Sequence, residues 1–312
     1  MTDASTSGDM SPQLLGVVER ARREPTGRFH SLAHLIDVPA LMRAYRRARK
    51  DAAVGVDGIT KERYGHDLRS NLRSLHERLK TNRYRHQPIR RVHIPKDKGK
   101  TRPIGISTFE DKLVQDAVRE VLEAIYEQDF LDCSYGFRPA RRAHDAIRAL
   151  DRAVQRGEVS WILEADIRSF FDSLDRTKLA EMLQVRVADG ALLQLIGKCL
   201  HAGVLDGAEY SEPEVGTAQG SALSPLLGNV YLHYVLDVWF EREVKPRLDG
   251  KAILVRYADD FVIGFERHDV EMCAARWRAA RPQDRQAPGQ GERDRTTLEP
   301  PKQIRPGLGC HP

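Results

Sequence analysis

The strongest constraint on how this chain can fold is a short acidic break between two apolar runs. Tyr257-Ala258-Asp259-Asp260 separates AILV at 252–255 from FVIGF at 261–265. Apolar, β-branched segments around so short a break predict a tight hairpin that carries both carboxylates at its tip. Two like charges about 4 Å apart at a partly desolvated site repel by about 4 kcal/mol, so we expect a cation there. Adjacent aspartates also occur in ordinary solvated turns, and only the rest of the sequence can distinguish the two interpretations.

A third acidic residue closes another strand that is expected to be buried. This strand is WILEADI at 161–167, and it delivers Asp166 near its end. A carboxylate at the end of an apolar strand is costly unless it is paired or binds a metal. Asp166 lies 93 residues before Asp259, which leaves room for helices at 177–188 and 190–200 before the two strands become neighbours in one sheet.

A basic hairpin is predicted between residues 89 and 106. IRRVHIP alternates as a strand does, KDKGK forms the loop, and RPIGI forms the second strand. The window 83–102 holds eight Lys or Arg and one acid, Asp97, which leaves a charge of +7. Such a loop suits a triphosphate or a nucleic-acid backbone, although most charge runs are solvated faces. The candidate contacts are Arg90, Arg91, Lys96, Lys98, Lys100 and Arg102.

Two further stretches combine a flexible turn with a helix. SYGFRPARRAHDAI at 134–147 places Arg138, Arg141 and Arg142 around a helix start, where they either grip phosphates or are simply solvated. The stretch at 216–241 places a loop of small residues before an apolar helix. In that loop Gln219 offers both a hydrogen-bond donor and an acceptor. Other helices are expected at 11–24, 38–50, 61–80 and 110–127.

Composition favours a folded protein with a polyanionic partner. The 312 residues are 41% hydrophobic and 30% charged, with a net charge of +5, which suits one large domain or two subdomains. The cysteines are too far apart for a disulfide framework or a zinc site, and neither an export signal nor a membrane span is apparent. These features predict a cytoplasmic protein without a membrane partner. The cysteines are Cys133, Cys199, Cys273 and Cys310.

Five of these stretches together resemble the bacterial group II intron-encoded reverse transcriptases. The matching blocks are IPKDKGKTRPIGIST (94–108), CSYGFRPARRAHDAI (133–147), ADIRSFFDSLD (165–175), GTAQGSALSPLLGNVYLHYVLDVWF (216–240) and YADDFVIGFE (257–266). They follow the order of the family and cover roughly 30–266. The resemblance implies an α+β fold with the fingers and palm of a right-hand polymerase, in which helices pack on an antiparallel sheet. It also implies an N-terminal extension at 1–29, fingers at 30–160 and a palm with the catalytic core at 161–266.

The resemblance also implies a reaction, RNA-directed DNA synthesis by two-metal transfer of a nucleotide from a dNTP to a primer 3′-OH. By this analogy Asp166 and Asp259 hold two Mg²⁺ ions, for which Mn²⁺ can substitute, and Asp260 lies beside them as a weaker ligand. The implied partners are an intron RNA template, a DNA primer and dNTPs. The resemblance does not set the oligomeric state.

The same comparison assigns residues around the incoming nucleotide. Lys96 and Arg102 match finger positions that contact the triphosphate, and Gln219 matches the loop residue along the nucleotide. Phe171 matches the aromatic residue that packs under the sugar and disfavours a 2′-OH. Its neighbour Phe170 is an equal candidate for that role, and simple core packing is an alternative for either residue.

The resemblance ends after Glu266. Where family members continue with further palm strands and a helical thumb, residues 267–312 become rich in Arg, Pro, Gln and Gly, which predicts a disordered tail and a missing thumb. Leu298, Pro300 and Lys302 have the L-x-P-x-K spacing of one missing strand, although a single match in so biased a tail carries little weight. We interpret the tail as the product of a truncation or frameshift, and polymerase activity as reduced or lost.

Two other functions remain open from the sequence. The first is a non-catalytic, maturase-type splicing factor that binds intron RNA, or an inert remnant of one. The second, the polymerase of another mobile element such as a retron, is less favoured by FVIGFE at 261–266 and LSPLLGNVYLHYVLD at 223–237. No Cys/His-rich endonuclease segment is present in the sequence.

Overall fold

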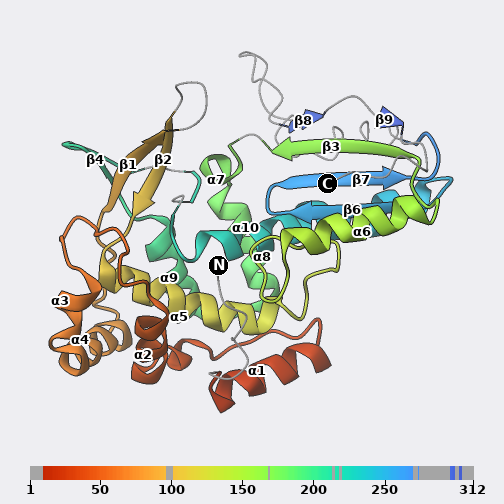
Figure 1. Cartoon of the computed structure of the whole chain (residues 1–312). Coiled ribbons are helices and arrows are strands. Elements are labelled where there is room, and N and C mark those ends of the chain that lie inside the picture. The colour runs from red at the N-terminus through yellow and green to blue at the C-terminus, as the bar shows by residue number, and fades with distance from the viewer. Residues whose placement is uncertain are drawn as a thin grey trace. The chain divides into compact units, whose positions relative to one another are not determined.

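The chain divides into two units, each with its own sheet and helices. The computed structural model describes residues 10–95, 101–167, 169–212, 215–217, 220–269 and 273, and the backbone of 296–298 and 302–303 (Figure 1). Unit 1 contains residues 1–129 and 171–230, and unit 2 contains residues 130–170 and 231–312. The expected boundary between fingers and palm at 160/161 falls inside unit 2, and the division into functional lobes stays a prediction.

Unit 1 is built mainly from helices that start at short polar caps. Ser11, Asp37, Thr108, Asp175 and Asp189 each accept a hydrogen bond from a backbone N–H in the first helical turn, which satisfies a donor that the helix leaves unpaired. The helices and helical turns of this unit are α1 (Pro12–Arg23), η1 (Ala33–Leu35), α2 (Val38–Arg47), α3 (Lys61–Gly65), α4 (Leu68–Lys80), α5 (Phe109–Tyr126), α8 (Arg176–Arg186) and α9 (Gly190–Leu200).

Helix α5 is the centre of unit 1. It is buried along most of its length and contacts α1, α2 and α9. Its apolar stripe, read from the sequence at 110–127, is confirmed as core by Leu113, Val114 and Val118, which are at most 1% exposed. Polar residues of α5 are buried as well, because Glu120 pairs with Arg43 of α2 at 2.9 Å.

One helix predicted from periodicity is two helices. The expected helix at 61–80 breaks between α3 and α4, around Gly65 and Asp67. A Cβ on Gly65 would lie 2.4 Å from the hydroxyl oxygen of Tyr45, so a larger residue here would have to displace the Tyr45 side chain. Tyr64 and Leu68 keep the four-residue spacing across the break, and periodicity therefore cannot reveal it.

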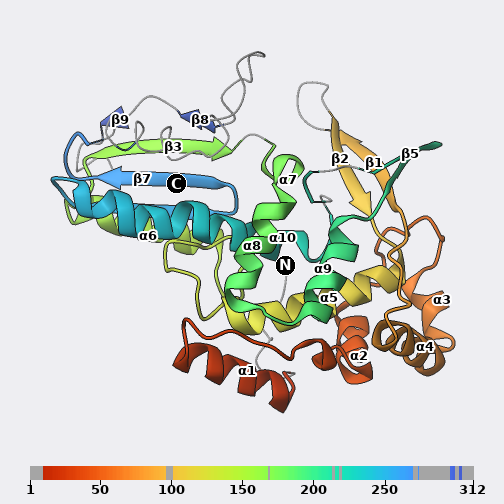
Figure 2. The same cartoon turned by 180° about the vertical axis from the view of Figure 1, so that it is seen from behind.

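The sheet of unit 1 confirms the predicted hairpin and adds a second one. Strands β1 (Ile89–Pro95) and β2 (Thr101–Ile106) pair antiparallel, while the loop predicted at 96–100 lies outside the described residues. Strands β4 (Val204–Asp206) and β5 (Glu209–Ser211) were not predicted; β4 is labelled in Figure 1 and β5 in Figure 2. β4 pairs parallel with β1, which gives the order β2-β1-β4-β5.

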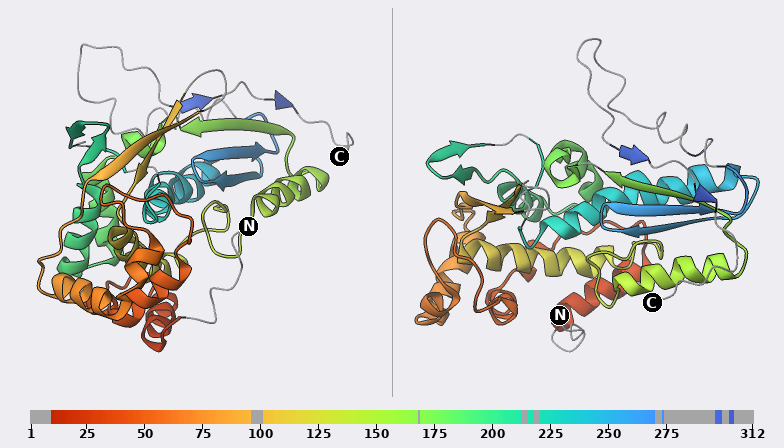
Figure 3. Two further views of the ribbon diagram at one scale, coloured as in Figure 1. Left: turned by 60° about the vertical axis from the view of Figure 1, so that its left-hand side comes forward. Right: turned by 45° about the horizontal axis from the view of Figure 1, so that its top comes forward.

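Unit 2 is an antiparallel sheet with helices on both faces. Strands β3 (Trp161–Ile167), β6 (Ala252–Tyr257) and β7 (Asp260–Phe265) run in the order β6-β7-β3, which confirms the predicted hairpin and the neighbouring Asp166 strand (Figure 3). The helical segments of this unit are α6 (Ala143–Gln155), the π-helices η3 (His233–Asp237) and η4 (Phe240–Val244), and η5 (Lys245–Arg247). Two helices, α7 (Phe170–Ser173) and α10 (Ser224–Leu232), include residues of both units.

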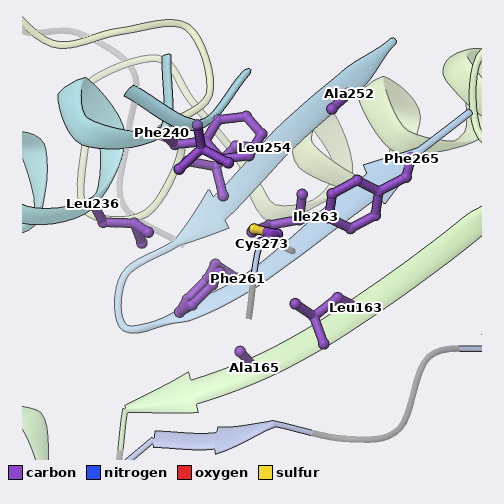
Figure 4. Packing of buried hydrophobic residues seen from close by; sticks show 11 residues of the cluster. Leu163, Ala165, Leu236, Phe240, Ala252, Leu254, Phe261, Ile263, Phe265 and Cys273 are labelled. Carbon is purple, nitrogen blue, oxygen red and sulfur yellow. The ribbon is translucent and has the colours of Figure 1, made fainter. Parts of the chain in front are cut away.

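The alternation of strand residues divides the core of unit 2 between two faces. On one face, Phe261, Ile263 and Phe265 of β7 pack with residues of η3 and η4, including Phe240 (Figure 4). On the other face, Val262 packs against the cluster formed with α6. Side chains that alternate between two apolar layers explain why FVIGF reads as a continuous apolar run rather than an alternating one.

Two short strands from the C-terminal stretch also pair with β3. They are β8 (Thr296–Leu298) and β9 (Lys302–Gln303), and their registers set Leu298 opposite Ala165 and Lys302 opposite Ile162. Leu298 and Lys302 of the L-x-P-x-K spacing thus lie beside β3, whereas Pro300 lies outside the described residues. Most of 267–312, for which disorder was predicted, lies outside the described residues.

Among the described residues, Cys133, Cys199 and Cys273 are free thiols. No helix in the described part of the chain is both long and apolar enough to cross a lipid bilayer.

Candidate active site

Two aspartates occupy opposing positions on neighbouring strands of unit 2. Asp166 of β3 pairs in register with Asp260 of β7, and both side chains are exposed. Residues directly opposite each other on antiparallel strands lie on the same face of the sheet, with Cβ atoms about 4.5–5.5 Å apart. The predicted meeting of these two carboxylates is therefore brought about by strand register.

The third carboxylate lies in the turn that connects β6 to β7. Ala258 and Asp259 form a two-residue turn between Tyr257 and Asp260, which pair across the hairpin. Ala258 has φ +60°, the sign that the primed turns of tight hairpins require. Asp259 is half-buried in this turn, next to the pair formed by Asp166 and Asp260.

The charge on Asp260 is disfavoured in the folded chain. Although Asp260 is exposed as a residue, partial burial of its carboxyl raises its pKa above the ordinary value, and the negative charge of Asp166 raises the pKa further. The described residues contain no group of three or more His, Cys, Asp or Glu already converged on one point as in a structural metal site. Mg²⁺ is commonly held by one or two carboxylates together with phosphate oxygens of a substrate, and these aspartates suit that kind of site.

The aspartates line a cavity between the sheet and helix α6. The cavity has a volume of about 550 Å³ and includes Asp166, Asp260 and Tyr257 on the sheet side. Ile147 and Leu150 of α6 form its apolar side. Such a cavity can bind a charged group at its carboxylates and a flat or aliphatic group against its apolar side.

The residues predicted to contact the triphosphate lie in unit 1 and are only partly described. Arg102 is exposed on β2, whereas Lys96 and Gln219 lie outside the described residues, as do Lys98 and Lys100. The pKa of Asp172 is raised by burial, while the charges of Arg91 and Arg102 act to lower it. The charges of Arg91 and Arg102 therefore both act on Asp172, which belongs to unit 1 as they do.

Phe170 and Phe171 have different surroundings. Phe170 is 5% exposed and lies edge-on to Tyr231, with ring centroids 6.1 Å apart. Phe171 is only half-buried, and its carbonyl oxygen accepts a hydrogen bond from the Thr217 N–H at 2.7 Å. Core packing explains Phe170, whereas Phe171 is the more exposed of the two aromatic residues.

The other predicted nucleic-acid contacts have different exposures. Arg138 is buried and donates to the carbonyl oxygens of Leu131 and Ser134, which favours a role in shaping the loop. Arg141 is half-buried and pairs with Asp132 at 2.6 Å, whereas Arg142 is exposed before α6. In unit 1, Arg90 donates to the carbonyl oxygen of Val54.

The sequence analysis missed one charged residue next to the acidic turn. Arg256 is 0% exposed and forms an ion pair with Asp237 of η3 at 2.6 Å. The signal that could have revealed Arg256 is its position as the single charged residue in the apolar strand AILVRY. Such a residue must be paired, because burying an unpaired charge is costly.

An antiparallel sheet that carries paired carboxylates at a strand end and a hairpin turn, with helices packed on it, matches the palm of a template-directed polymerase that the sequence predicts. The family model for "Reverse transcriptase (RNA-dependent DNA polymerase)" matches residues 94–278, more than half of the chain. The chain belongs to this reverse transcriptase family.

One of the proteins similar to this chain is encoded by a group II intron. The chain is 38% identical over 212 residues to the group II intron-encoded protein LtrA of Lactococcus lactis subsp. cremoris, a match that covers 66% of this chain and 35% of that protein. It is 34% identical over 277 residues to protein YkfC of Escherichia coli K12, covering 78% of this chain and 72% of that protein. It is also 34% identical over 106 residues to nuclear intron maturase 1, mitochondrial, of Arabidopsis thaliana, covering 33% and 15%. The chain thus spans about a third of the length of the Lactococcus protein.

Proposed function

We propose that the chain is the fingers and palm of a group II intron-encoded protein and that it catalyses RNA-directed DNA synthesis. The observation that carries the proposal is the register of β3 against β7, which pairs Asp166 with Asp260 directly after Asp259. Membership of the reverse transcriptase family supports the reaction type. The name of the Lactococcus relative supports the link to a group II intron.

In this proposal Asp166 and Asp259 hold two Mg²⁺ ions, with Asp260 beside them. The fit is supported by the register that sets Asp166 opposite Asp260, and a cation there would offset the burial and the repulsion by Asp166 that raise the pKa of Asp260. When bound, the ions would lower the pKa of the primer 3′-OH and neutralise the triphosphate and the leaving pyrophosphate. The contribution of the protein is to hold the carboxylates on adjoining strands, so that little rearrangement is needed when the substrates bind.

Four residues of unit 1 are assigned nucleotide contacts in this proposal. Arg102 and Lys96 contact the triphosphate, Gln219 lies along the nucleotide, and Phe171 packs under the sugar. Support for Arg102 comes from its exposure and from its electrostatic effect on Asp172. The guanidinium group of an arginine suits phosphate oxygens because its N–H groups can donate two parallel hydrogen bonds.

The template and primer are intron RNA and DNA. The phosphates of the template and primer contact basic side chains, which attract them by charge and do not distinguish one base sequence from another. Arg138 contributes by holding its loop in shape, since its guanidinium is buried on backbone carbonyls. The remaining contacts are Arg90, Arg91, Lys98, Lys100, Arg141 and Arg142.

Primer extension on poly(rA)/oligo(dT) with Mg²⁺ tests the reaction. We expect the parent chain to incorporate dTTP and Asp259→Asn to lose more than about 100-fold in rate, because even outer-shell partners of a metal are worth 10- to 100-fold. Asp249→Asn is the matched control, since Asp249 is an exposed aspartate of the same unit. Its rate should equal that of the parent.

RNA binding separates the proposal from its main alternative. Binding of intron RNA is measured in parallel, and Asp259→Asn should retain it, because the basic side chains are unchanged. A parent chain that binds RNA but incorporates no nucleotide would contradict the polymerase function and leave the non-catalytic splicing factor. A parent chain with neither property would be an inert remnant.

A further inference from the structure

The backbone of the acidic turn has a conformation that needs support. Ala258 lies in the left-handed region at φ +60°, which non-glycine residues adopt at a cost. Residues in such conformations persist when the surrounding structure holds them. The support comes from the strand that leads into the turn, because Nη1 of Arg256 donates to the carbonyl oxygen of Ala258 at 2.9 Å.

The same guanidinium is anchored at its other edge by Asp237. Nε of Arg256 donates to Oδ1 of Asp237 at 2.7 Å, and Nη2 donates to Oδ2 at 2.6 Å. Both side chains are 0% exposed. A bidentate pair of this kind fixes the plane of the guanidinium as well as its position. Asp237 is the last residue of the π-helix η3, a rare element that is frequent at functional sites.

A loop from another part of unit 2 completes the anchor. Nη2 of Arg256 also donates to Oγ of Ser134 at 2.8 Å. The backbone N–H of Arg256 donates to the carbonyl oxygen of Cys133, and its carbonyl oxygen accepts from the Tyr135 N–H, both at 2.8 Å. Next in this loop is Gly136, where a Cβ would lie 2.3 Å from the Ala258 nitrogen. The loop therefore lies directly against the edge strand β6 and the turn.

The side chain of Arg256 acts from the face opposite to the carboxylate pair. Arg256 pairs with Phe261 across the hairpin, one position away from the pair of Tyr257 with Asp260. Successive side chains point to opposite faces, so the guanidinium cannot itself meet a group bound at Asp260. A buried ion pair is often replaceable by apolar residues when only stability is concerned. The additional hydrogen bond from Arg256 to the carbonyl oxygen of Ala258 supports the turn. An apolar residue in place of Arg256 would lose this support.

We propose that Arg256 is a positioning residue, which fixes the turn carrying Asp259 by joining the carbonyl of Ala258 to Asp237 and Ser134. The consequence for catalysis rests on the proposed function, whereas the effect on the turn does not. Without Arg256 the turn samples other conformations and Asp259 loses its fixed distance from Asp166. Metal affinity then falls because the ligands are no longer pre-positioned.

Hydrogen exchange on the full chain, followed by mass spectrometry, tests the positioning directly. In Arg256→Lys we expect peptides that cover 256–262 to exchange at least about tenfold faster, because the turn opens locally. Ser134→Ala, a milder change, should accelerate the same peptides by a smaller factor. Arg186→Lys is the matched control: Arg186 is 1% exposed and donates to the carbonyl oxygens of Glu24 and Gly27 in unit 1. It should leave peptides 256–262 unchanged.

Mn²⁺ binding, followed by the electron paramagnetic resonance of the free ion, gives the second measurement. Arg256→Lys should weaken binding by about tenfold, and Arg186→Lys should not weaken it. Unchanged exchange at 256–262 in both Arg256→Lys and Ser134→Ala would overturn the proposal. If Arg256→Lys does not fold, Ser134→Ala alone decides it. A parent chain without Mn²⁺ binding would contradict the proposed function, while the exchange measurement would still decide the role of Arg256.

Discussion

Asp166 and Asp260 occupy directly paired positions on β3 and β7, so that two acidic side chains share one face of the sheet of unit 2. The pairing raises the pKa of Asp260, after the larger effect of its burial. A sheet selected for stability alone would avoid like charges directly opposite each other. The arrangement is better explained by a ligand that needs both carboxylates.

The first prediction concerns pH. The folded chain holds the proton of Asp260 more tightly than the unfolded chain does, so ionisation of Asp260 destabilises the fold progressively as pH rises above the ordinary pKa of 3.8. Without divalent ions, Asp260→Asn should therefore gain in melting temperature relative to the parent between about pH 4 and pH 7. Thermal unfolding across this range checks the result. Parallel curves for parent and variant would contradict it, and Asp249→Asn should follow the parent.

The second prediction concerns Gly136. A Cβ at this position would lie 2.3 Å from the nitrogen of Ala258, so Gly136→Ala must force the loop and the acidic turn apart. We expect nucleotide incorporation to fall by more than about tenfold, since misplacement of about 1 Å can cost about 100-fold. Primer extension measures the loss, and circular dichroism verifies that the chain remains folded.

A control for glycine replacement is available in α1. Gly16 is exposed in that helix, and a Cβ there would have no neighbour within 4 Å. Gly16→Ala should raise the free energy of unfolding by about 0.5–1 kcal/mol and leave incorporation unchanged. Equal activity of Gly136→Ala and Gly16→Ala would show that the turn tolerates displacement.

The third prediction concerns the different roles of the neighbouring aromatic residues Phe170 and Phe171. Phe171→Ala should increase the incorporation of ribonucleotides relative to deoxyribonucleotides, because the sugar would lose the aromatic surface that excludes a 2′-OH. Phe170→Ala should instead lower the free energy of unfolding by about 3–5 kcal/mol, since Phe170 is 5% exposed, and should leave sugar discrimination unchanged. Competition between dTTP and UTP during primer extension distinguishes the two. The opposite outcome would assign the sugar contact to Phe170.

The fourth prediction concerns a buried ion pair of unit 1. Arg43 of α2 donates to both carboxylate oxygens of Glu120, and each residue is 8% exposed. Arg43→Met should lower the free energy of unfolding by about 3 kcal/mol, because it leaves a buried charge with fewer partners. Arg47 still pairs with Glu120, which keeps the loss near the lower end of the usual range.

Urea unfolding measures this loss, with Arg49→Met as the control. Arg49 pairs with Asp51 on the surface, where an ion pair is screened by solvent, and its replacement should have no measurable effect. If the two variants unfold at the same urea concentration, the pair of Arg43 with Glu120 contributes no more than a surface pair does.

Local sequence patterns predicted which helices and strands form more reliably than they predicted where each one begins and ends. The alternation around Asp97 predicted β1 and β2, and the apolar stripe of α5 predicted a core helix, because both depend on periodicity within one segment. The break at Gly65 was missed, since the stripe continues across it. Strands β4 and β5 were missed because three residues are too few for a period to be read.

The candidate site was predicted unevenly for a related reason. Asp259 and Asp260 could be recognised because their neighbours in the chain form the hairpin. Arg256 was overlooked because its partners, Asp237 and Ser134, are 19 and 122 residues away. No local pattern connects residues so far apart.

The sequence by itself determined the hairpin, the apolar strands and the three acidic residues, because these depend on side chains adjacent in the chain. Only the tertiary structure decided that Asp166 is opposite Asp260, that Phe170 is buried while Phe171 is half-buried, and that Arg256 holds the turn. Each of these depends on register and packing between distant segments. A shift of one residue in the pairing of β3 with β7 would turn Asp166 to the other face of the sheet, and the site would be lost without any change in composition.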